Sequence, residues 1–237
     1  MLKMGGEYLE GDSRYGIDPR AAHRLATLLR ETITATDVEL AIVIGGGNMW
    51  RGRDAVQYGM EPAAADYIGM LGTVMNALTL QDALEREGIV TRVQTAIEMR
   101  QVAEPYIRRR AIDHMEDRKV VIFGAGTGNP FFSTDTAGAL RAMEVGAEVM
   151  IKATYVDGIY DADPKKVPTA KKYDRLSYLD VLNMRLEVMD ATAISLCMEN
   201  NLPILVLRLE EEGALTRAIK GEAVGTYVGP VESVTQA

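Results

Sequence analysis

The sequence predicts an α/β fold in which helices cover both faces of a mainly parallel central sheet. Short, β-branched and almost entirely apolar runs recur along the chain, as expected of strands that are buried on both faces. These runs are residues 40–44, 89–94, 119–123, 148–151 and 204–207. Helical patterns separate them, and such alternation implies βαβ crossovers and a parallel sheet. A further short strand carries Lys3, directly before a turn at Gly5 and Gly6.

The helices between these strands have readable starts. Asp18 places a capping carboxylate ahead of Pro19, and proline suits the first helical position. Thr134 or Asp135 is expected to cap a later helix, and Asp190 to cap another. The predicted helices are residues 20–34, 63–87, 136–145 and 191–200.

Residues 152–187 interrupt the alternation with a polar stretch that contains Pro164, Pro168 and several lysines. An excursion of this length in a compact domain is usually functional, so we expect a lid or a nucleotide-binding lobe. A solvated charged surface is the simpler alternative. No internal repeat divides the chain, which we interpret as one continuous domain.

Composition sets limits on partners and location. The 237 residues are 47% hydrophobic and 25% charged, which is typical of a globular protein with a sizeable core. The net charge of -8 argues against a nucleic-acid backbone or an anionic membrane as the main partner. Cys197 is the only cysteine, so intrachain disulfides and cysteine-rich metal sites are excluded. Neither a signal peptide nor a membrane span is evident, and we expect a cytoplasmic protein.

Two loops predict phosphate binding. Residues 127–135 and residues 45–52 each follow a predicted strand and are rich in small side chains. Such loops direct backbone N–H groups toward an anion at the positive end of a helix dipole. Two of them suggest two phosphorylated ligands that face each other, and therefore phosphoryl transfer. A Rossmann site is disfavoured because residues 124–128 lack the G-x-G-x-x-G spacing, and no Walker A motif occurs.

A few charged side chains accompany these loops. Arg51 follows the glycine triplet and could clamp phosphate oxygens in a bidentate manner. Lys3, next to its glycine turn, could stabilise a transferring phosphoryl group. Asp135 and Asp190 could simply cap helices, or could also hold Lys3 and organise a magnesium-bound nucleotide. Asp66 could be a surface charge or could accept a hydrogen bond from a ribose hydroxyl.

Several motifs together carry a resemblance to a known family. They are residues 3–7, 45–52, Asp66 with 69–76, 127–135, 152–164 and 188–190. In this order they resemble the bacterial UMP kinase (uridylate kinase) family of the amino-acid-kinase superfamily, over almost the whole chain. The stretch 127–135 is highly specific to that family, whereas the glycine triplet is common across the superfamily.

The resemblance implies a transferase that moves the γ-phosphoryl group of ATP, with Mg²⁺, to UMP in pyrimidine biosynthesis. It implies a three-layer αβα sandwich, the amino-acid-kinase fold, and no metal held by the protein alone. The implied catalytic residues are Lys3, Arg51, Asp135 and Asp190. The implied UMP-binding residues are Gly46, Asp66, Thr127, Gly128, Asn129, Pro130, Phe131, Phe132, Ser133 and Thr134. The implied ATP-binding residues are Lys3, Met4, Gly5, Gly6, Gly47, Arg51, Thr154, Tyr160 and Asp163.

The resemblance also implies an assembly and its regulation. It implies a homohexamer that GTP activates and UTP inhibits. A regulatory loop is implied at Gly11, Asp12, Ser13, Arg14, Tyr15 and Gly16. Within the single domain, residues 1–150 would form the UMP-binding and oligomerisation half, and residues 151–237 the ATP-binding half.

The chain departs from the family pattern at three places. Gly5 stands where a serine is usual, which predicts weakened ATP binding, and Tyr155 stands where a lysine is frequent. Only two residues precede Lys3, so we expect the lysine to be held less firmly and residues 1–7 to be more mobile than residues 40–52. Two alternatives stay open: a kinase of the same fold that makes an acyl phosphate from carbamate or N-acetylglutamate, and a non-catalytic nucleotide-binding protein.

Overall fold

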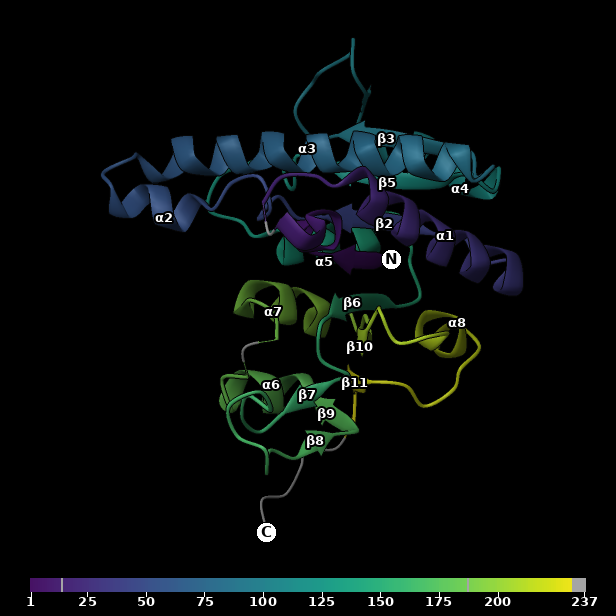
Figure 1. Ribbon diagram of the computed structural model, residues 1–237. Coiled ribbons are helices and arrows are strands. Elements are labelled where there is room, and N and C mark those ends of the chain that lie inside the picture. The colour runs from purple at the N-terminus through teal and green to yellow at the C-terminus, as the bar shows by residue number, and fades with distance from the viewer. Residues whose placement is uncertain (14, 187, 232–237) are drawn as a thin grey trace.

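Strands of the described residues form one twisted sheet with the first strand at its centre (Figure 1). The computed structural model describes residues 1–13, 15–186 and 188–231. Nine strands of these residues make up the sheet, in the order β4-β3-β5-β2-β1-β6-β10-β11-β9. Their bounds are β1 Leu2–Met4, β2 Ala41–Ile44, β3 Thr91–Thr95, β4 Glu104–Pro105, β5 Val120–Gly124, β6 Met150–Thr154, β9 Arg175–Ser177, β10 Ile204–Arg208 and β11 Thr226–Gly229. Neighbouring strands are parallel except β10 and β11, which confirms the predicted mainly parallel sheet.

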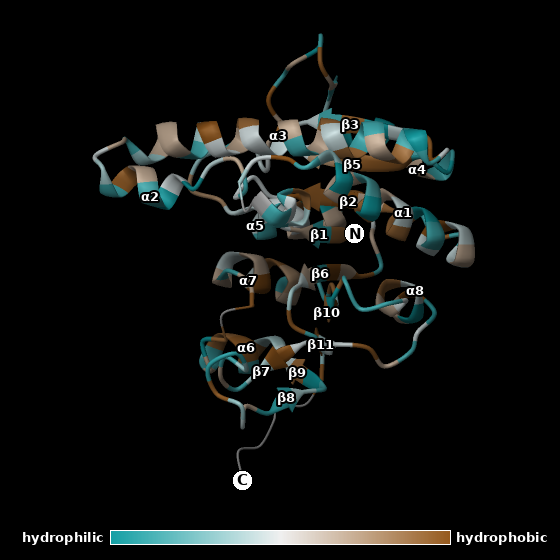
Figure 2. Cartoon of the chain, viewed as in Figure 1, coloured by the Kyte–Doolittle hydropathy of each residue, from teal (hydrophilic) through white to brown (hydrophobic). Residues whose placement is uncertain are grey.

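Helices cover both faces of this sheet. On β2, Ile42 packs with α1 (Pro19–Thr36), α3 (Pro62–Arg86) and α8 (Ala214–Ile219). Its neighbour Val43 packs on the opposite face with α4 (Arg108–Glu116), α5 (Thr134–Glu144) and α7 (Ala191–Glu199). This alternation is the period of two that a strand imposes on its side chains. Figure 2 shows the apolar strands between helices of mixed hydropathy. The three-layer αβα sandwich is therefore confirmed.

The first strand is firmly paired, contrary to the expectation from its short length. Lys3 lies in register with Val43 of β2 on one side and with Lys152 of β6 on the other. The flanking side chains Leu2 and Met4 are fully buried. A central strand that is hydrogen-bonded on both edges holds its residues as well as a longer strand at the edge would. The expected weak anchoring of Lys3 is therefore wrong.

The helix caps follow the sequence with one correction. The Asp18 side chain accepts from Arg20 N–H at 2.8 Å, and Asp190 accepts from Ala193 N–H at 3.0 Å, as predicted. The cap of α5 is Ser133, whose hydroxyl accepts from the N–H groups of the second and third residues that follow it. Ser133 has the extended backbone that a cap requires, whereas Thr134 and Asp135 already lie in the first turn.

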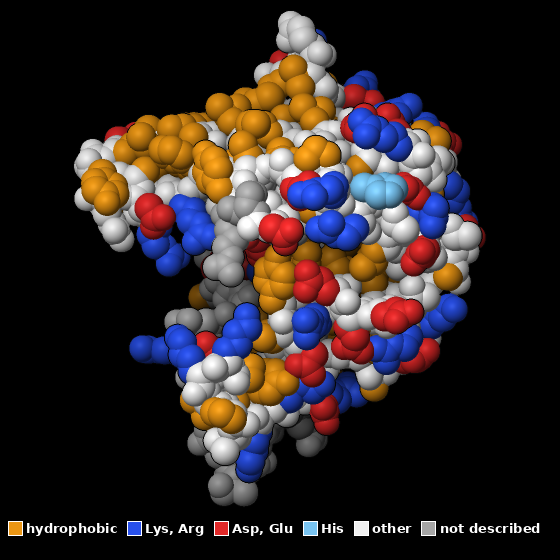
Figure 3. Space-filling view, in the orientation of Figure 1, with side chains coloured by type: hydrophobic (Ala, Val, Ile, Leu, Met, Phe, Trp, Pro, Cys, Tyr) orange, Lys and Arg blue, Asp and Glu red, His pale blue; other side chains and the backbone are white. Residues whose placement is uncertain are grey.

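The polar excursion forms a small lobe at one end of the sheet. It contains the antiparallel pair β7 (Ile159–Tyr160) and β8 (Lys172–Tyr173), together with β9 and α6 (Tyr178–Asn183). At the other side of the molecule, α2 (Gly52–Gln57) projects with the start of α3. Figure 3 shows a hollow between these two parts, with Lys and Arg side chains on both rims. Across the described ranges of the chain, no helix is both long and apolar enough to cross a bilayer.

Candidate active site

Three turns from distant parts of the chain meet at the carboxyl ends of neighbouring strands. A Cβ placed on Gly45 would lie 3.3 Å from Gly6 N and 3.5 Å from Thr134 Oγ1. Gly45 N–H also donates to Met4 O at 2.9 Å. Because β1, β2 and β5 are parallel neighbours, the loops that follow them emerge at the same edge of the sheet. The three turns therefore lie together at one edge of the sheet.

A pair of lysines flanks Asp135 at the centre of this edge. Lys3 Nζ lies 2.7 Å from Asp135 Oδ1, and Lys152 Nζ lies 2.5 Å from the same oxygen. All three side chains are largely buried, with at most 13% exposed. Lys3 and Lys152 are register partners on adjacent strands, so both side chains point to the face on which α5 begins. The predicted contact between Asp135 and Lys3 is present.

Lys152 is the site residue that sequence reasoning missed. In the sequence it was only the first residue of the polar stretch 152–187 and of the motif 152–164, directly after an apolar run, much as Lys3 directly follows Leu2. A lysine directly after an apolar run was the signal that could have drawn attention to Lys152. That β1 and β6 lie next to each other, however, follows from the sheet topology and not from the local sequence pattern.

Burial and charge shape the protonation of this cluster. Burial alone would raise the pKa of Asp135, but the ammonium groups of Lys3 and Lys152 outweigh it and hold that pKa below its usual value. Burial, followed by the charge of the neighbouring Lys3, lowers the pKa of Lys152 to about 8, although Asp135 opposes the shift. The centre of the site therefore carries an ionised carboxylate between cations, one of which titrates near neutral pH.

Asp190 joins the N-termini of two helices beside this cluster. Its carboxylate accepts from Thr136 Oγ1 of α5 at 2.9 Å and from the hydroxyl of Ser133, the cap of α5, while it caps α7. Two helix N-termini, each a positive dipole end, are thereby held together. We find no ion pair between Asp190 and a lysine among the described residues, so its position favours helix organisation.

A first cavity of about 180 Å³ brings together half of the residues predicted for the acceptor site. Its walls include Gly46 and Gly47 of the second turn, Asp66 of α3, and Thr127, Phe132 and Thr134 of the third loop. Asp66 Oδ2 also accepts from Phe131 N–H at 2.7 Å and so holds that loop to α3. The other predicted residues of the loop, Gly128, Asn129, Pro130 and Ser133, lie next to the walls along the chain but do not line the cavity.

A second cavity of about 510 Å³ lies against the small lobe. Thr154, Tyr160 and Asp163, the three residues predicted to hold the adenine nucleotide, all line it. Thr154 follows Lys152 by two residues on β6, and Thr134 of the first cavity precedes Asp135. The lysine cluster thus connects the walls of both cavities.

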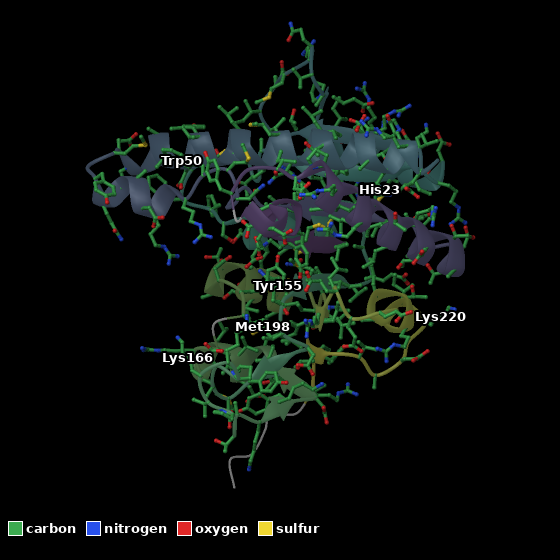
Figure 4. All side chains as sticks on the ribbon, viewed as in Figure 1. His23, Trp50, Tyr155, Lys166, Met198 and Lys220 are labelled. Atoms are coloured by element: carbon green, nitrogen blue, oxygen red, sulfur yellow. The ribbon has the colours of Figure 1, made fainter. Side chains whose placement is uncertain are left out.

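Two other predicted residues, Arg51 and Met4, have side chains that line neither cavity. Arg51 is exposed and precedes α2, between the cavity-lining Trp50 and Gly52, and it makes no ion pair within the described parts of the chain. Figure 4 shows Trp50 beside α3 and Tyr155 nearer the middle of the molecule. Met4 is fully buried, so only its backbone could reach a ligand.

The two departures at Gly5 and Tyr155 have local structural partners. A Cβ on Gly5 would overlap the Glu7 carboxylate, so a serine there would require Glu7 to move. Tyr155 stacks on Tyr8 with ring centroids 4.9 Å apart, and Tyr8 donates to Thr154 O at 2.8 Å. The tyrosine at position 155 is therefore packed beside a wall of the second cavity.

The predicted regulatory loop lies beside the second turn. Gly11, Asp12 and Ser13 form a short 3₁₀ turn, and Tyr15 is exposed. Gly16 N–H donates to Asn48 O at 2.8 Å, one residue after Gly47. Arg14 lies outside the described residues.

The carboxylates present suit magnesium that arrives with a nucleotide. Mg²⁺ usually takes one or two carboxylates from the protein and its other ligands from phosphates and water. Asp135 engages its lysines through Oδ1 alone, and Asp190 is taken up by hydroxyl and N–H donors. Among the described residues, no group of three or more His, Cys, Asp or Glu side chains could hold a metal by itself.

Comparison with known proteins places the chain among kinases. The amino acid kinase family matches residues 1–208. The uridylate kinase of Deinococcus radiodurans is 57% identical over 229 residues, which cover 96% of this chain and 93% of that protein. The crystal structure of UMP kinase from Bacillus anthracis superposes with a TM-score of 0.94 at 36% identity, covering 100% of this chain and 97% of that one. UMP kinase from Ureaplasma parvum superposes with a TM-score of 0.88 at 33% identity, covering 96% and 97%.

Proposed function

The chain belongs to the amino acid kinase family and, within it, to the uridylate kinases, and on this premise we propose how its residues transfer the γ-phosphoryl group of ATP to UMP. The protein is a nucleoside monophosphate kinase that makes UDP. The observation that carries the residue assignment is the lysine cluster of Lys3, Asp135 and Lys152, which connects the walls of two cavities.

The two cavities divide the substrates between the halves of the chain. The first is lined only by residues 46–134 and takes UMP, with Asp66 toward the ribose and Gly46 toward the phosphate. The second is lined only by residues 154–206 and takes the adenine nucleotide at Thr154, Tyr160 and Asp163. On this basis we assign residues 1–150 to the UMP-binding and oligomerisation half and residues 151–237 to the ATP-binding half.

The chemistry needs position and charge more than a base. A phosphate oxygen of UMP bonds to the γ-phosphorus as the bond from that phosphorus to the β–γ bridging oxygen breaks, and ADP leaves. Lys3 and Lys152 stabilise the charge on the transferring group. N–H groups of the turns at Gly5, Gly6 and Gly47, together with Arg51, hold the ATP phosphates.

Asp135 keeps the two lysines in place, and Asp190 keeps the N-termini of α5 and α7 together. A magnesium ion bound with ATP would supply further neutralisation of phosphate charge, and Asp135 and Asp190 would be the carboxylates to hold it.

An acceptor assay tests this assignment. The purified protein with ATP and magnesium is offered UMP, CMP, carbamate and N-acetylglutamate in turn, and ADP release is measured. We expect rapid turnover with UMP, and a kcat lower by about 10²-fold in Lys3→Ala, because that lysine acts on the transition state. Turnover of another acceptor while UMP fails would assign a different kinase, and binding of both nucleotides without UDP formation would indicate a non-catalytic protein.

We further propose that the protein works as a homohexamer in the cytoplasm, activated by GTP and inhibited by UTP through residues 11–16. Self-association is supported by α3, which presents Tyr67, Ile68, Leu71 and Met75 to solvent although its opposite face is also apolar. A helix that is apolar on all sides is normally buried.

A further inference from the structure

Two asparagine side chains form a buried pair beneath the glycine turns, and no step of the transfer described above uses them. Asn48 is 2% exposed and Asn76, on α3, is 0% exposed. Asn48 Nδ2 donates to Asn76 Oδ1 at 3.0 Å, and Asn76 Nδ2 donates back to Asn48 Oδ1 at 2.7 Å. The second hydrogen of Asn48 goes to Gly16 O at 2.7 Å, and that of Asn76 goes to Gly45 O at 2.7 Å. Every amide N–H of the pair is therefore used.

Backbone carbonyls fix the orientation of both amides. Gly16 O and Gly45 O can only accept hydrogen bonds, so each must face an NH₂ group and not an amide oxygen. An aspartate at position 76 has nearly the same shape as asparagine, but it would place an acceptor against Gly45 O. An isosteric substitution can therefore break the network without leaving a cavity.

The pair contacts several parts of the site at once. Gly45 of the second turn is bonded to Asn76, and a Cβ on Gly6 of the first turn would overlap Asn48 Oδ1 and lie 2.7 Å from Asn76 Nδ2. Gly16 is held from both sides, because its N–H donates to Asn48 O and its carbonyl accepts from the Asn48 side chain. The second turn and the end of the 11–16 loop therefore share one hydrogen-bonded unit, and Gly6 of the first turn lies against it.

We propose that Asn48 and Asn76 are positioning residues that set the turn at residues 45–47 for phosphate binding and join it to Gly16. The proposal rests on the proposed function, because these turns are the ones assigned to nucleotide phosphates. A buried donor or acceptor left without a partner is costly, so the turn shifts to regain its bonds when one partner is lost. Residues 11–16 line neither nucleotide cavity in the described chain, and the pair gives them a direct connection to the turn.

Asn76→Asp and a matched control test the positioning role. Asn200→Asp makes the same chemical change at an exposed amide that also donates to a backbone carbonyl. We expect Asn76→Asp to lower kcat/KM by roughly tenfold or more, chiefly through higher KM for both nucleotides, since a displacement of about 1 Å can cost 10²-fold. Asn200→Asp should stay within about twofold of the wild type. A folded Asn76→Asp protein with kcat/KM within that same range would overturn the proposal.

Amide hydrogen exchange tests the connection to Gly16. Asn76 does not touch Gly16, yet the Gly16 N–H should exchange faster in Asn76→Asp and not in Asn200→Asp, because the pair acts as a unit. Unchanged exchange at Gly16 would overturn the connection. If Asn76→Asp does not fold, Asn76→Ser is held to the same criteria. Absence of UDP formation by the wild type would reject the proposed function, whereas the exchange measurement would still decide whether the network holds Gly16.

Discussion

Lys3 and Lys152 share a single carboxylate oxygen, which leaves one positive charge uncompensated at the centre of the site. A buried, unbalanced charge disfavours the folded state. The extra positive charge is useful only when an anion neutralises it, as phosphate groups do during transfer. We infer that this cluster is arranged for the charge of the transition state more than for the stability of the free protein.

The pKa of Lys152, about 8, gives this arrangement a pH signature. As the pH rises through about 8, the free enzyme loses the Lys152 proton, so kcat/KM should fall there. Lys152→Met should lack this descending limb and have a kcat lower by about 10²-fold. Profiles of kcat/KM from pH 6 to about 10 for both proteins check the prediction. A limb that persists unchanged in Lys152→Met would assign it to another group.

The same pKa predicts that the stability of the folded protein rises with pH, whereas kcat/KM falls. The folded-state pKa of Lys152, about 8, lies below its ordinary value of 10.5, so between these values the unfolded chain binds more protons than the folded one. The contribution of Lys152 to the free energy of unfolding therefore rises with pH across that window. The stability of the wild type relative to Lys152→Met should increase there in urea titrations, because groups common to both proteins cancel.

Asp66 both lines the first cavity and holds the loop at Phe131, and two substitutions can separate these roles. It lines the first cavity and also holds Phe131 N–H, where the backbone has a positive φ of 69°. Asp66→Ala should raise the KM for UMP about tenfold or more with a smaller change in kcat, because it removes binding made in both ground and transition states. Asp66→Asn keeps an acceptor for Phe131 N–H and so isolates the ribose contact. A normal KM for UMP in Asp66→Ala would remove this residue from the site.

At the level of elements, the sequence predicted those parts that local patterns determine. Strands buried on both faces read as apolar runs, so β2, β3, β5, β6 and β10 were predicted within two or three residues of their bounds. The helices α2, α4, α6 and α8 were not among the predicted ranges, because they are short or polar and present no long apolar period. The Ser133 cap was missed because three consecutive residues there can each cap a helix.

The site shows the same division between local and long-range information. Glycine turns and the carboxylates at helix starts could be found from the chain alone. Lys152 and the amide pair of Asn48 and Asn76 could not be found, because their roles arise only when β6 lies beside β1 and α3 lies against the second turn. No local pattern encodes those contacts.

The packing of α5 on β1 makes a prediction about Gly138. A Cβ there would lie 2.8 Å from Met150 Cε and 3.2 Å from Lys3 Cγ, so Gly138 leaves room for the lysine stem under the helix. Alanine normally stabilises a helix by about 1 kcal/mol relative to glycine. We expect Gly138→Ala instead to lower kcat about tenfold by displacing Lys3. Gly69→Ala, on α3, where the nearest atom to an added Cβ is Trp50 Cδ1 at 3.8 Å, is the control for helix propensity in thermal unfolding. A more stable Gly138→Ala protein with full kcat would contradict this account.

At the scale of the whole molecule, one continuous sheet carries both cavities. β1 and β6, which hold Lys3 and Lys152, are hydrogen-bonded neighbours in this sheet. On the proposed assignment, the UMP-binding and ATP-binding halves therefore join through strands and not through a flexible linker. The two proposed nucleotide sites would then keep a fixed relative position, while the exposed lobe around β7 and β8 and the projecting α2 frame the hollow between them.

The exposed face of α3 predicts how copies of the chain associate. Leu71 and Met75 are 47% and 49% exposed in the middle of a long helix, and Figure 3 shows apolar side chains gathered along that part of the surface. Exposed apolar patches of this kind usually mark interfaces. Leu71→Asp should therefore shift the protein to smaller species in sedimentation velocity, because a charge would be buried in the interface at a cost of several kcal/mol. Leu179→Asp replaces an equally exposed leucine on α6 and should leave the assembly unchanged. If Leu71→Asp sediments like the wild type, α3 is not the contact surface and the apolar face must serve another partner.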